Sequence, residues 1–220
     1  MTIYGNPDPK KIKAIIFDFD ETMYFSPNIK AEYNKYIKKT VMALSNLSEK
    51  ETLCLMDKLG FTGGGKKRLS FTKNCESFGI SKRAWDEYRI KNFFEIDYSK
   101  ATIAPNALYQ NLAKKFALYI ASNEVLDNVL HKAKRLGIEL SPFKKIMAPT
   151  PQNLHAYSSK EQSFWAIQKL ENCRFDEMLI IGDRYNVDIQ PLEKLGGHGV
   201  LVKTTNDIVE FFETFLKENL

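Results

Sequence analysis

Apolar residues along this chain follow two spacings, and the change between them divides the sequence into regions. Residues 14–17 (Ala-Ile-Ile-Phe) are continuously apolar and rich in β-branched side chains, which predicts a strand buried on both faces, as in a parallel sheet. From residue 28 to about residue 94, apolar side chains recur every three or four positions, which is typical of amphipathic helices. The pattern therefore predicts one buried strand followed by a run of helices.

The helical region contains four predicted helices. Ser48 and Glu51 form a capping-box pair that starts the second of them, and Gly79 separates the third from the fourth. The four helices are expected at residues 29–46, 48–60, 70–78 and 81–94. Because they come directly after the first strand, we predict a small all-helical unit inserted there, over residues 25–100.

The remainder of the chain alternates between the two patterns. The predicted helices span residues 105–115, 124–136, 161–170, 187–195 and 208–216, and the predicted strands span residues 116–121, 144–148, 178–181 and 200–202. Gly137 is expected as a helix C-cap, and Phe164 and Trp165 as core residues. Such alternation produces right-handed βαβ units. We therefore predict an α/β fold, a parallel sheet with helices on both faces, formed by residues 1–24 and 101–220.

Composition places the chain among ordinary globular proteins. It has 220 residues, of which 44% are hydrophobic and 27% charged, enough for one α/β unit and a small accessory unit. No apolar run approaches the roughly 20 residues of a membrane-spanning helix, and residues 1–10 lack the apolar region of a signal peptide. Three cysteines without a CxxC pair are typical of buried, reduced thiols. We therefore expect a cytoplasmic protein with no membrane partner.

The net charge of +5 is modest and is spread along the sequence. It would suit an anionic substrate, but it gives little reason to expect nucleic-acid binding. The one local cluster, residues 66–68 (Lys-Lys-Arg), follows three glycines. We interpret it as a solvated turn, because short charge runs usually belong to the soluble surface.

Carboxylates follow the first buried strand directly. Asp18 and Asp20 are two residues apart, and Thr22 comes two residues later. Burying unpaired acids in a core is costly, so the pair is expected just past the strand's carboxyl end, where parallel α/β sheets bind their ligands. Two acids this close repel each other unless a cation or a shared proton relieves the repulsion. A solvated acidic turn would also explain this stretch when it is considered alone.

The ends of the other predicted strands carry polar side chains that complete this chemistry: Ser122 and Asn123 after the second strand, Lys160 near a helix start, and Asp183 and Asp188 after the strand that ends at Ile181. Each has an ordinary explanation by itself, such as Ser122 as a helix N-cap or Lys160 as a surface lysine. Together, at one edge of a parallel sheet, they predict a site for a divalent cation and a phosphate group.

These residues resemble the ordered motifs of the haloacid dehalogenase superfamily. The matches are residues 18–22 (Asp-Phe-Asp-Glu-Thr) to its DxDxT motif, Ser122 to its second motif, and Gly182-Asp183 with Asp188 to its GDxxxxD fourth motif. The resemblance implies a Rossmann-like core formed by the α/β region. The helical insertion stands where the family places its type 1 cap.

Two positions depart from the family pattern. Glu21 stands where relatives often have glycine, and Lys160 lacks the Lys-Pro pair that is common in the third motif. Lys144 and Lys145 are alternatives for the phosphate-binding lysine. Both lie inside or before a predicted strand, however, so Lys160 is preferred.

The resemblance also implies roles in phosphoryl transfer. Asp18 would be the nucleophile that forms an aspartyl-phosphate, and Asp20 would be the general acid and then the general base. The phosphate group would be bound by Ser122, Asn123 and Lys160, of which the lysine supplies a full charge.

The implied cofactor is Mg²⁺, a hard cation that prefers oxygen ligands. Its ligands would be the Asp18 carboxylate, the Asp20 backbone carbonyl and Asp183. Thr22 would shape the loop, and Asp188 would orient the lysine or hold a metal-bound water.

Asp20 also distinguishes reactions within the superfamily. Dehalogenating relatives keep the first aspartate but no acid two residues later in this role, so a phosphate ester is expected rather than a carbon–halogen bond. The sequence therefore predicts a Mg²⁺-dependent phosphatase for a small phosphorylated metabolite such as a nucleotide or a sugar phosphate. A phosphomutase would use the same motifs. A non-catalytic binding protein on this fold would be expected to lack at least one catalytic acid, and here none is missing.

Overall fold

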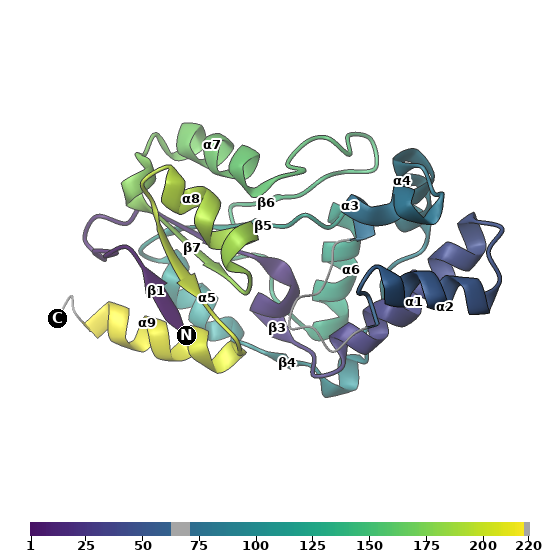
Figure 1. Ribbon diagram of the computed structural model, residues 1–220. Helices are drawn as coiled ribbons and strands as arrows, with labels where there is room; N and C mark the ends of the chain where they lie inside the picture. The colour runs from purple at the N-terminus through teal and green to yellow at the C-terminus, as the bar shows by residue number, and fades with distance from the viewer. Residues whose placement is uncertain (63–70, 218–220) are drawn as a thin grey trace. The chain divides into compact units, whose positions relative to one another are not determined.

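The computed structural model of the chain describes residues 1–62 and 71–217 (Figure 1). The chain divides into two compact units, one formed by Met1–Ser26 with Lys100–Leu220 and the other by Pro27–Ser99. The basic cluster at residues 66–68 lies outside the described residues. Within the described ranges, no helix combines the length and the apolar character needed to cross a bilayer.

The first unit is built on a six-stranded sheet in the order β1-β8-β7-β2-β5-β6 (Figure 1). The edge strand β1 (Thr2–Tyr4) pairs antiparallel with β8 (His198–Leu201), and all other neighbours are parallel. The remaining strands are β2 (Ala14–Phe17), β5 (Ala117–Ala121), β6 (Lys145–Met147) and β7 (Met178–Gly182). The predicted α/β fold with a parallel sheet is confirmed. The sequence missed β1, because a short, largely exposed edge strand has no continuous apolar run.

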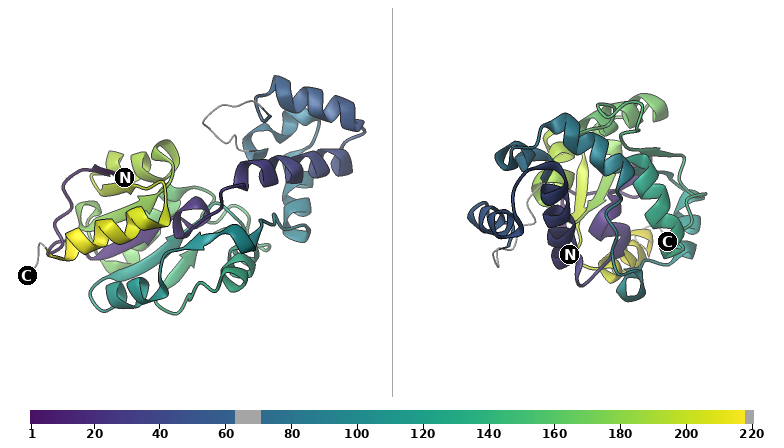
Figure 2. Two further views of the ribbon diagram at one scale, coloured as in Figure 1. Left: turned by 90° about the horizontal axis from the view of Figure 1, so that it is seen from below. Right: turned by 90° about the vertical axis from the view of Figure 1, so that its right-hand side faces the viewer.

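Helices cover both faces of this sheet, as Figures 1 and 2 show. Ile16 of β2 belongs to the core cluster that contains Phe164 of α7 and Leu192 of α8. The next residue, Phe17, lies on the opposite face and packs edge-on against Tyr109 of α5 with ring centroids 5.2 Å apart. The helices of this unit are α5 (Asn106–Ala113), α6 (Leu126–Leu136), α7 (Lys160–Glu171), α8 (Gln190–Lys194) and α9 (Thr205–Lys217). A strand buried on both faces therefore needs apolar side chains at every position, as β2 has.

A two-stranded antiparallel ribbon marks the points where the chain leaves and re-enters this unit. It is formed by β3 (Tyr24–Phe25) and β4 (Thr102–Ile103), with Tyr24 opposite Ile103. The ribbon brings the two ends of the intervening segment together, which allows an insertion without disturbing the sheet.

The second unit contains helices and no strands among its described residues, so an inserted helical region is confirmed. Its helices are α1 (Ile29–Leu44), α2 (Glu49–Lys58), α3 (Phe71–Asn74) and α4 (Lys82–Lys91). The predicted capping box starts α2: the Ser48 hydroxyl accepts from the Glu51 N–H, and the Glu51 carboxylate accepts from the Ser48 N–H. The core is aromatic, with Phe71 and Trp85 packed edge-on at 4.9 Å between ring centroids.

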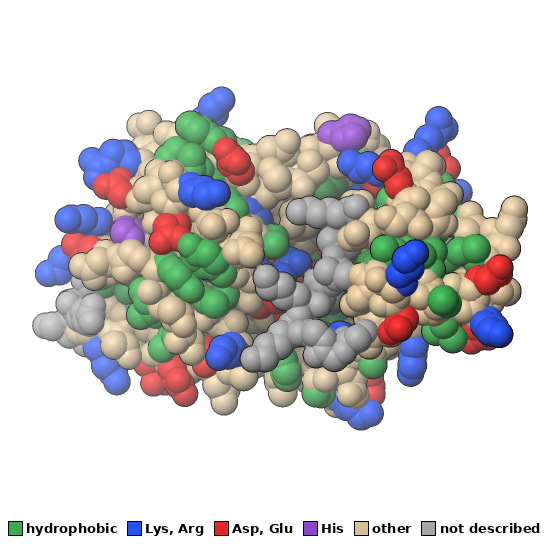
Figure 3. Space-filling view, in the orientation of Figure 1, with side chains coloured by type: hydrophobic (Ala, Val, Ile, Leu, Met, Phe, Trp, Pro, Cys, Tyr) green, Lys and Arg blue, Asp and Glu red, His purple; other side chains and the backbone are tan. Residues whose placement is uncertain are grey.

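Two packing predictions are wrong. Trp165 is 46% exposed and packs edge-on against Phe175, because Phe164 carries the buried face of α7 and each residue turns about 100° round a helix. Cys54 is exposed, whereas Cys75 and Cys173 are buried as expected. On the face drawn in Figure 3, acidic and basic side chains are interspersed among the described residues, in keeping with the modest net charge.

Candidate active site

The candidate site begins where β2 ends. Asp18 follows the strand directly and is only 2% exposed. Its backbone N–H bonds to the Ile181 carbonyl of β7 at 2.9 Å, which holds Asp18 beside the strand that leads to Asp183. Because β2 lies between β5 and β7, the carboxyl ends of three parallel strands meet around Asp18.

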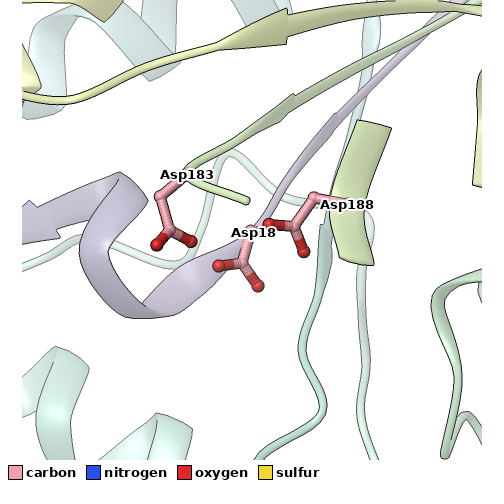
Figure 4. Close-up of side chains that lie close together, drawn as sticks. All are labelled: Asp18, Asp183 and Asp188. Carbon is pink, nitrogen blue, oxygen red and sulfur yellow. The ribbon is translucent and has the colours of Figure 1, made fainter. Parts of the chain in front are cut away.

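Three carboxylates converge at this point. Asp18, Asp183 and Asp188 each offer an oxygen, and these oxygens lie within 4.8 Å of one another. Figure 4 shows the three side chains pointing toward a common centre from the ends of β2 and β7 and from the helical turn Tyr185–Ile189. Asp188 is fully buried, and its burial, reinforced by the nearby Asp18 charge, raises the pKa of its carboxyl above the ordinary value. Such crowding of like charges favours a bound cation.

Gly182 makes this approach possible. A Cβ atom at Gly182 would lie 2.4 Å from the Cβ of Asp188, far closer than two carbon atoms can pack. Any side chain there would push Asp188 out of the cluster. The glycine of the Gly-Asp motif is therefore required sterically, because the end of β7 and the following helical turn touch at this residue.

Lys160 brings a positive charge to the carboxylates. It is the first residue of α7 and is 3% exposed, and Ser159 caps the helix by accepting the Gln162 N–H. The Lys160 ammonium donates to Asp18 Oδ1 and to the Ala121 carbonyl, and it lies 3.4 Å from Asp188 Oδ1. Lys160 therefore links the ends of β2 and β5 to the acidic cluster.

The two alternative lysines are placed elsewhere. Lys144 is exposed and pairs with Glu171 at 2.9 Å. Lys145 is exposed as well, and its ammonium lies 5.8 Å from the centre of the Tyr157 ring. The described contacts thus join Lys160, and neither alternative, to Asp18.

The other predicted residues differ in their surroundings. Ser122 is buried after β5, and its hydroxyl oxygen accepts the Glu124 N–H at 3.1 Å, which directs its own proton elsewhere. The next residue, Asn123, is exposed. Thr22 is buried, and its hydroxyl has no hydrogen-bond partner within the described parts of the chain.

Asp20 has different hydrogen-bond partners from Asp18. Its Oδ1 accepts a hydrogen bond from the Tyr24 hydroxyl at 2.5 Å and another from the Lys132 ammonium at 2.7 Å. Lys132 belongs to α6 and is 1% exposed. The sequence pattern did not predict either partner, and Lys132 stands 112 residues from Asp20.

The backbone at Glu21 adopts the conformation that favours glycine, which is the residue that relatives often have at this position. Glu21 has a φ of +63°, in the left-handed region that costs a residue with a side chain about 1 kcal/mol and suits glycine. Its carboxylate accepts the Ser26 N–H at 3.1 Å, which offsets part of that cost. The two acids have different neighbours: Lys160 bonds to Asp18, whereas Tyr24 and Lys132 bond to Asp20.

Arg184 adds a further cation that the sequence had not singled out. Its Nε lies 3.6 Å from Asp183 Oδ1 and 3.9 Å from Asp188 Oδ2. Among the described residues, the ion pairs of the site join four carboxylates to three cations: Asp18, Asp20, Asp183 and Asp188 to Lys132, Lys160 and Arg184. A divalent cation would add positive charge to this set and favour the binding of a phosphate dianion.

The surroundings of Asp18 are compatible with a bound metal ion. Its Oδ1 is bonded by Lys160, whereas its Oδ2 is buried and has no hydrogen-bond partner among the described residues. A buried carboxylate oxygen left without a partner is costly unless a ligand uses it. Together with Asp183 and Asp188, the Asp18 carboxylate offers a set of hard oxygen donors of the kind that Mg²⁺ prefers.

Comparisons with known proteins bear on the family and the fold. A family model described as haloacid dehalogenase-like hydrolase matches residues 12–196. No curated protein matches the sequence. The fold is similar to a HAD phosphatase from Thermococcus onnurineus, with a TM-score of 0.56 and 13% identity over 91% of this chain and 98% of that chain.

Two further solved structures are similar. A predicted phosphoglycolate phosphatase from Haemophilus somnus has a TM-score of 0.54 and 21% identity over 87% of this chain and 85% of that chain. A predicted phosphatase from Clostridium acetobutylicum has a TM-score of 0.55 and 17% identity over 94% of this chain and 99% of that chain. At such identities the shared property is the fold.

Proposed function

The chain belongs to the haloacid dehalogenase-like hydrolases, and on that premise we propose that it is a Mg²⁺-dependent phosphatase that acts on small phosphomonoesters. The observation that carries the proposal is the state of Asp18. Lys160 holds its Oδ1, and its Oδ2 is buried without a hydrogen-bond partner among the described residues. Asp183 and Asp188 each offer a carboxylate oxygen within 4.8 Å of an Asp18 oxygen. A carboxylate that is fixed in place and still has reactive lone pairs is suited to nucleophilic catalysis.

In the proposed first step, a carboxylate oxygen of Asp18 attacks phosphorus while the bond to the ester oxygen breaks. Asp20 gives its proton to the departing oxygen. Lys160 and the Ser122 hydroxyl stabilise the charge on the equatorial phosphoryl oxygens, where it develops during phosphoryl transfer. Asn123, beside Ser122, is a further candidate phosphate ligand.

In the second step, Asp20 is a carboxylate and takes a proton from the attacking water, which releases phosphate and restores Asp18. The metal ligands would be the Asp18 carboxylate, the Asp20 backbone carbonyl and Asp183, and bound Mg²⁺ would neutralise the phosphate charge. Asp188 keeps Lys160 in place, and Thr22 shapes the turn.

We propose that the helical region, residues 25–100, is the cap of this enzyme and selects the substrate. A cap of this size favours small phosphorylated metabolites, such as a nucleotide or a sugar phosphate, over phosphoproteins. The structural neighbours named as phosphatases support phosphate esters as the substrate class.

Asp18→Asn tests the nucleophile, because the amide has nearly the same shape and no charge. The wild-type protein should release phosphate from p-nitrophenyl phosphate only with Mg²⁺ present, and the variant should release none while keeping its circular dichroism spectrum. Asp176→Asn, at an exposed carboxylate of the same unit, is the matched control and should keep full activity. Phosphate release by the Asp18→Asn protein would refute the proposal. A panel of nucleotides and sugar phosphates would then identify the substrate.

A further inference from the structure

Helix α6 carries a polar row that leads to the site. Glu124 precedes the helix, and Asn128 and Lys132 follow at intervals of four residues, so the three lie on one side. Asn128 donates to Glu124 at 3.0 Å, and both Asn128 and Lys132 are 1% exposed. A buried polar row on a helix packed in a core calls for an explanation, because apolar residues would fill the same space at lower cost.

The Lys132 ammonium is the costliest member of this row. Taking an ammonium group out of water costs several kcal/mol unless an opposite charge compensates for it. The compensating charge is Asp20, whose Oδ1 lies 2.7 Å from Lys132 Nζ. Asp20 is a residue of the proposed chemistry, so the buried lysine acts on the reacting groups through Asp20.

Two hydrogen bonds hold one oxygen of Asp20. Tyr24 and Lys132 both donate to Oδ1, which uses the acceptor capacity of that atom. The pair therefore fixes the orientation of the Asp20 carboxyl group.

We propose that Lys132, together with Tyr24, is a positioning residue that holds Asp20 for proton transfer to the leaving group. This inference rests on the proposed phosphatase function. In the step concerned, the bond from phosphorus to an Asp18 oxygen forms, the bond from phosphorus to the ester oxygen breaks, and the proton moves from the Asp20 carboxyl group to the ester oxygen. Asp20 is left as a carboxylate, and the Lys132 charge stabilises it as it forms.

The dependence of rate on the leaving group tests this assignment. A poor leaving group such as an alkoxide needs the proton, whereas a dinitrophenolate departs without it. Lys132→Met keeps the length of the side chain and removes the charge. It should lower kcat/KM for alkyl and phenyl phosphates by about 100-fold, the scale of general acid catalysis, and leave kcat/KM for dinitrophenyl phosphate nearly unchanged.

Three further variants separate positioning from a structural role. Lys134→Met, at an exposed lysine of the same helix, should change neither substrate class. Tyr24→Phe should show the same leaving-group pattern as Lys132→Met, with a smaller effect. In an Asp20→Asn background, Lys132→Met should cause no further loss, because its effect passes through Asp20.

Two results would overturn the inference: an equal loss of kcat/KM for all leaving groups, or an additional loss in the Asp20→Asn background. If Lys132→Met does not fold, Tyr24→Phe alone makes the same test. Failure of the phosphatase proposal has a different signature, since the wild-type protein would then hydrolyse neither the alkyl nor the dinitrophenyl ester.

Discussion

Both units of the protein contain buried ion pairs, and the two kinds differ in how they are assembled. In the helical unit, Arg89 donates to Asp86 at 2.9 Å, and both residues belong to α4, three positions apart. In the α/β unit, Lys160 reaches Asp18 from 142 residues away, and Lys132 reaches Asp20 from 112 residues away. A local pair can form as soon as its helix forms and serves the packing of that helix. A distant pair forms only when the sheet is complete, and here such pairs converge on one strand end.

This difference indicates that the two units have different roles. Within the described residues, the groups that can hold a metal ion lie at the end of β2 and β7, and the helical unit is organised around aromatic packing. Each unit should therefore respond to its own perturbations, and the three experiments that follow test that separation.

The largest effect is expected from Trp85→Ala in the helical unit. Trp85 packs against Phe71 and donates from Nε1 to the Thr72 hydroxyl at 3.0 Å, and removing a buried tryptophan costs about 3–5 kcal/mol. Calorimetry should show an early transition for the helical unit, while the α/β unit keeps its own transition. Trp165→Ala, at a half-exposed position, is the matched control and should cost about 1 kcal/mol. Loss of both transitions together would show that the units are not separate.

A smaller effect is expected from Mg²⁺ on the α/β unit. A ligand at 100 times its Kd stabilises the folded state by about 2.7 kcal/mol, so Mg²⁺ should raise the Tm of this unit and EDTA should lower it again. Asp183→Asn should abolish the shift, and Asp176→Asn should not. The shift should persist in Trp85→Ala, and its disappearance there would contradict the proposed independence of the two units.

The smallest effect is expected from Ser48→Ala, which removes the cap of α2. The loss of an N-cap hydrogen bond costs about 1 kcal/mol, so urea denaturation of the helical unit should shift by that amount. Phosphatase activity at temperatures well below unfolding should stay the same. A change in kcat would show that the cap residue matters beyond stability.

Much of the fold could be predicted because its pattern is local. β2 and β7 are buried at every position and therefore appear in the sequence as continuous apolar runs. Residues that directly follow such strands, such as Asp18 and Asp183, are placed by the sheet itself. Gly137 adopts a φ of +70° at the end of α6, as its C-cap position predicted.

Some residues could not be predicted because contacts between distant parts of the chain determine their surroundings. Lys132 lies inside a helix whose exposed positions also carry lysine, so composition could not distinguish it. The available signal was the spacing of four residues from Glu124 to Asn128 and again from Asn128 to Lys132, in a row that starts two residues after Ser122. The prediction that Trp165 lies in the core was wrong for a local reason. An aromatic residue that follows a buried one in a helix is not necessarily buried as well.

The chain contains two tryptophans, Trp85 in the helical unit and Trp165 in the α/β unit, which are 5% and 46% exposed. An indole surrounded by hydrocarbon fluoresces at a shorter wavelength than one in contact with water. The protein therefore carries one intrinsic fluorophore in each unit, and the two should emit at different wavelengths. Replacing either tryptophan with phenylalanine leaves a single emitter whose spectrum follows one unit alone.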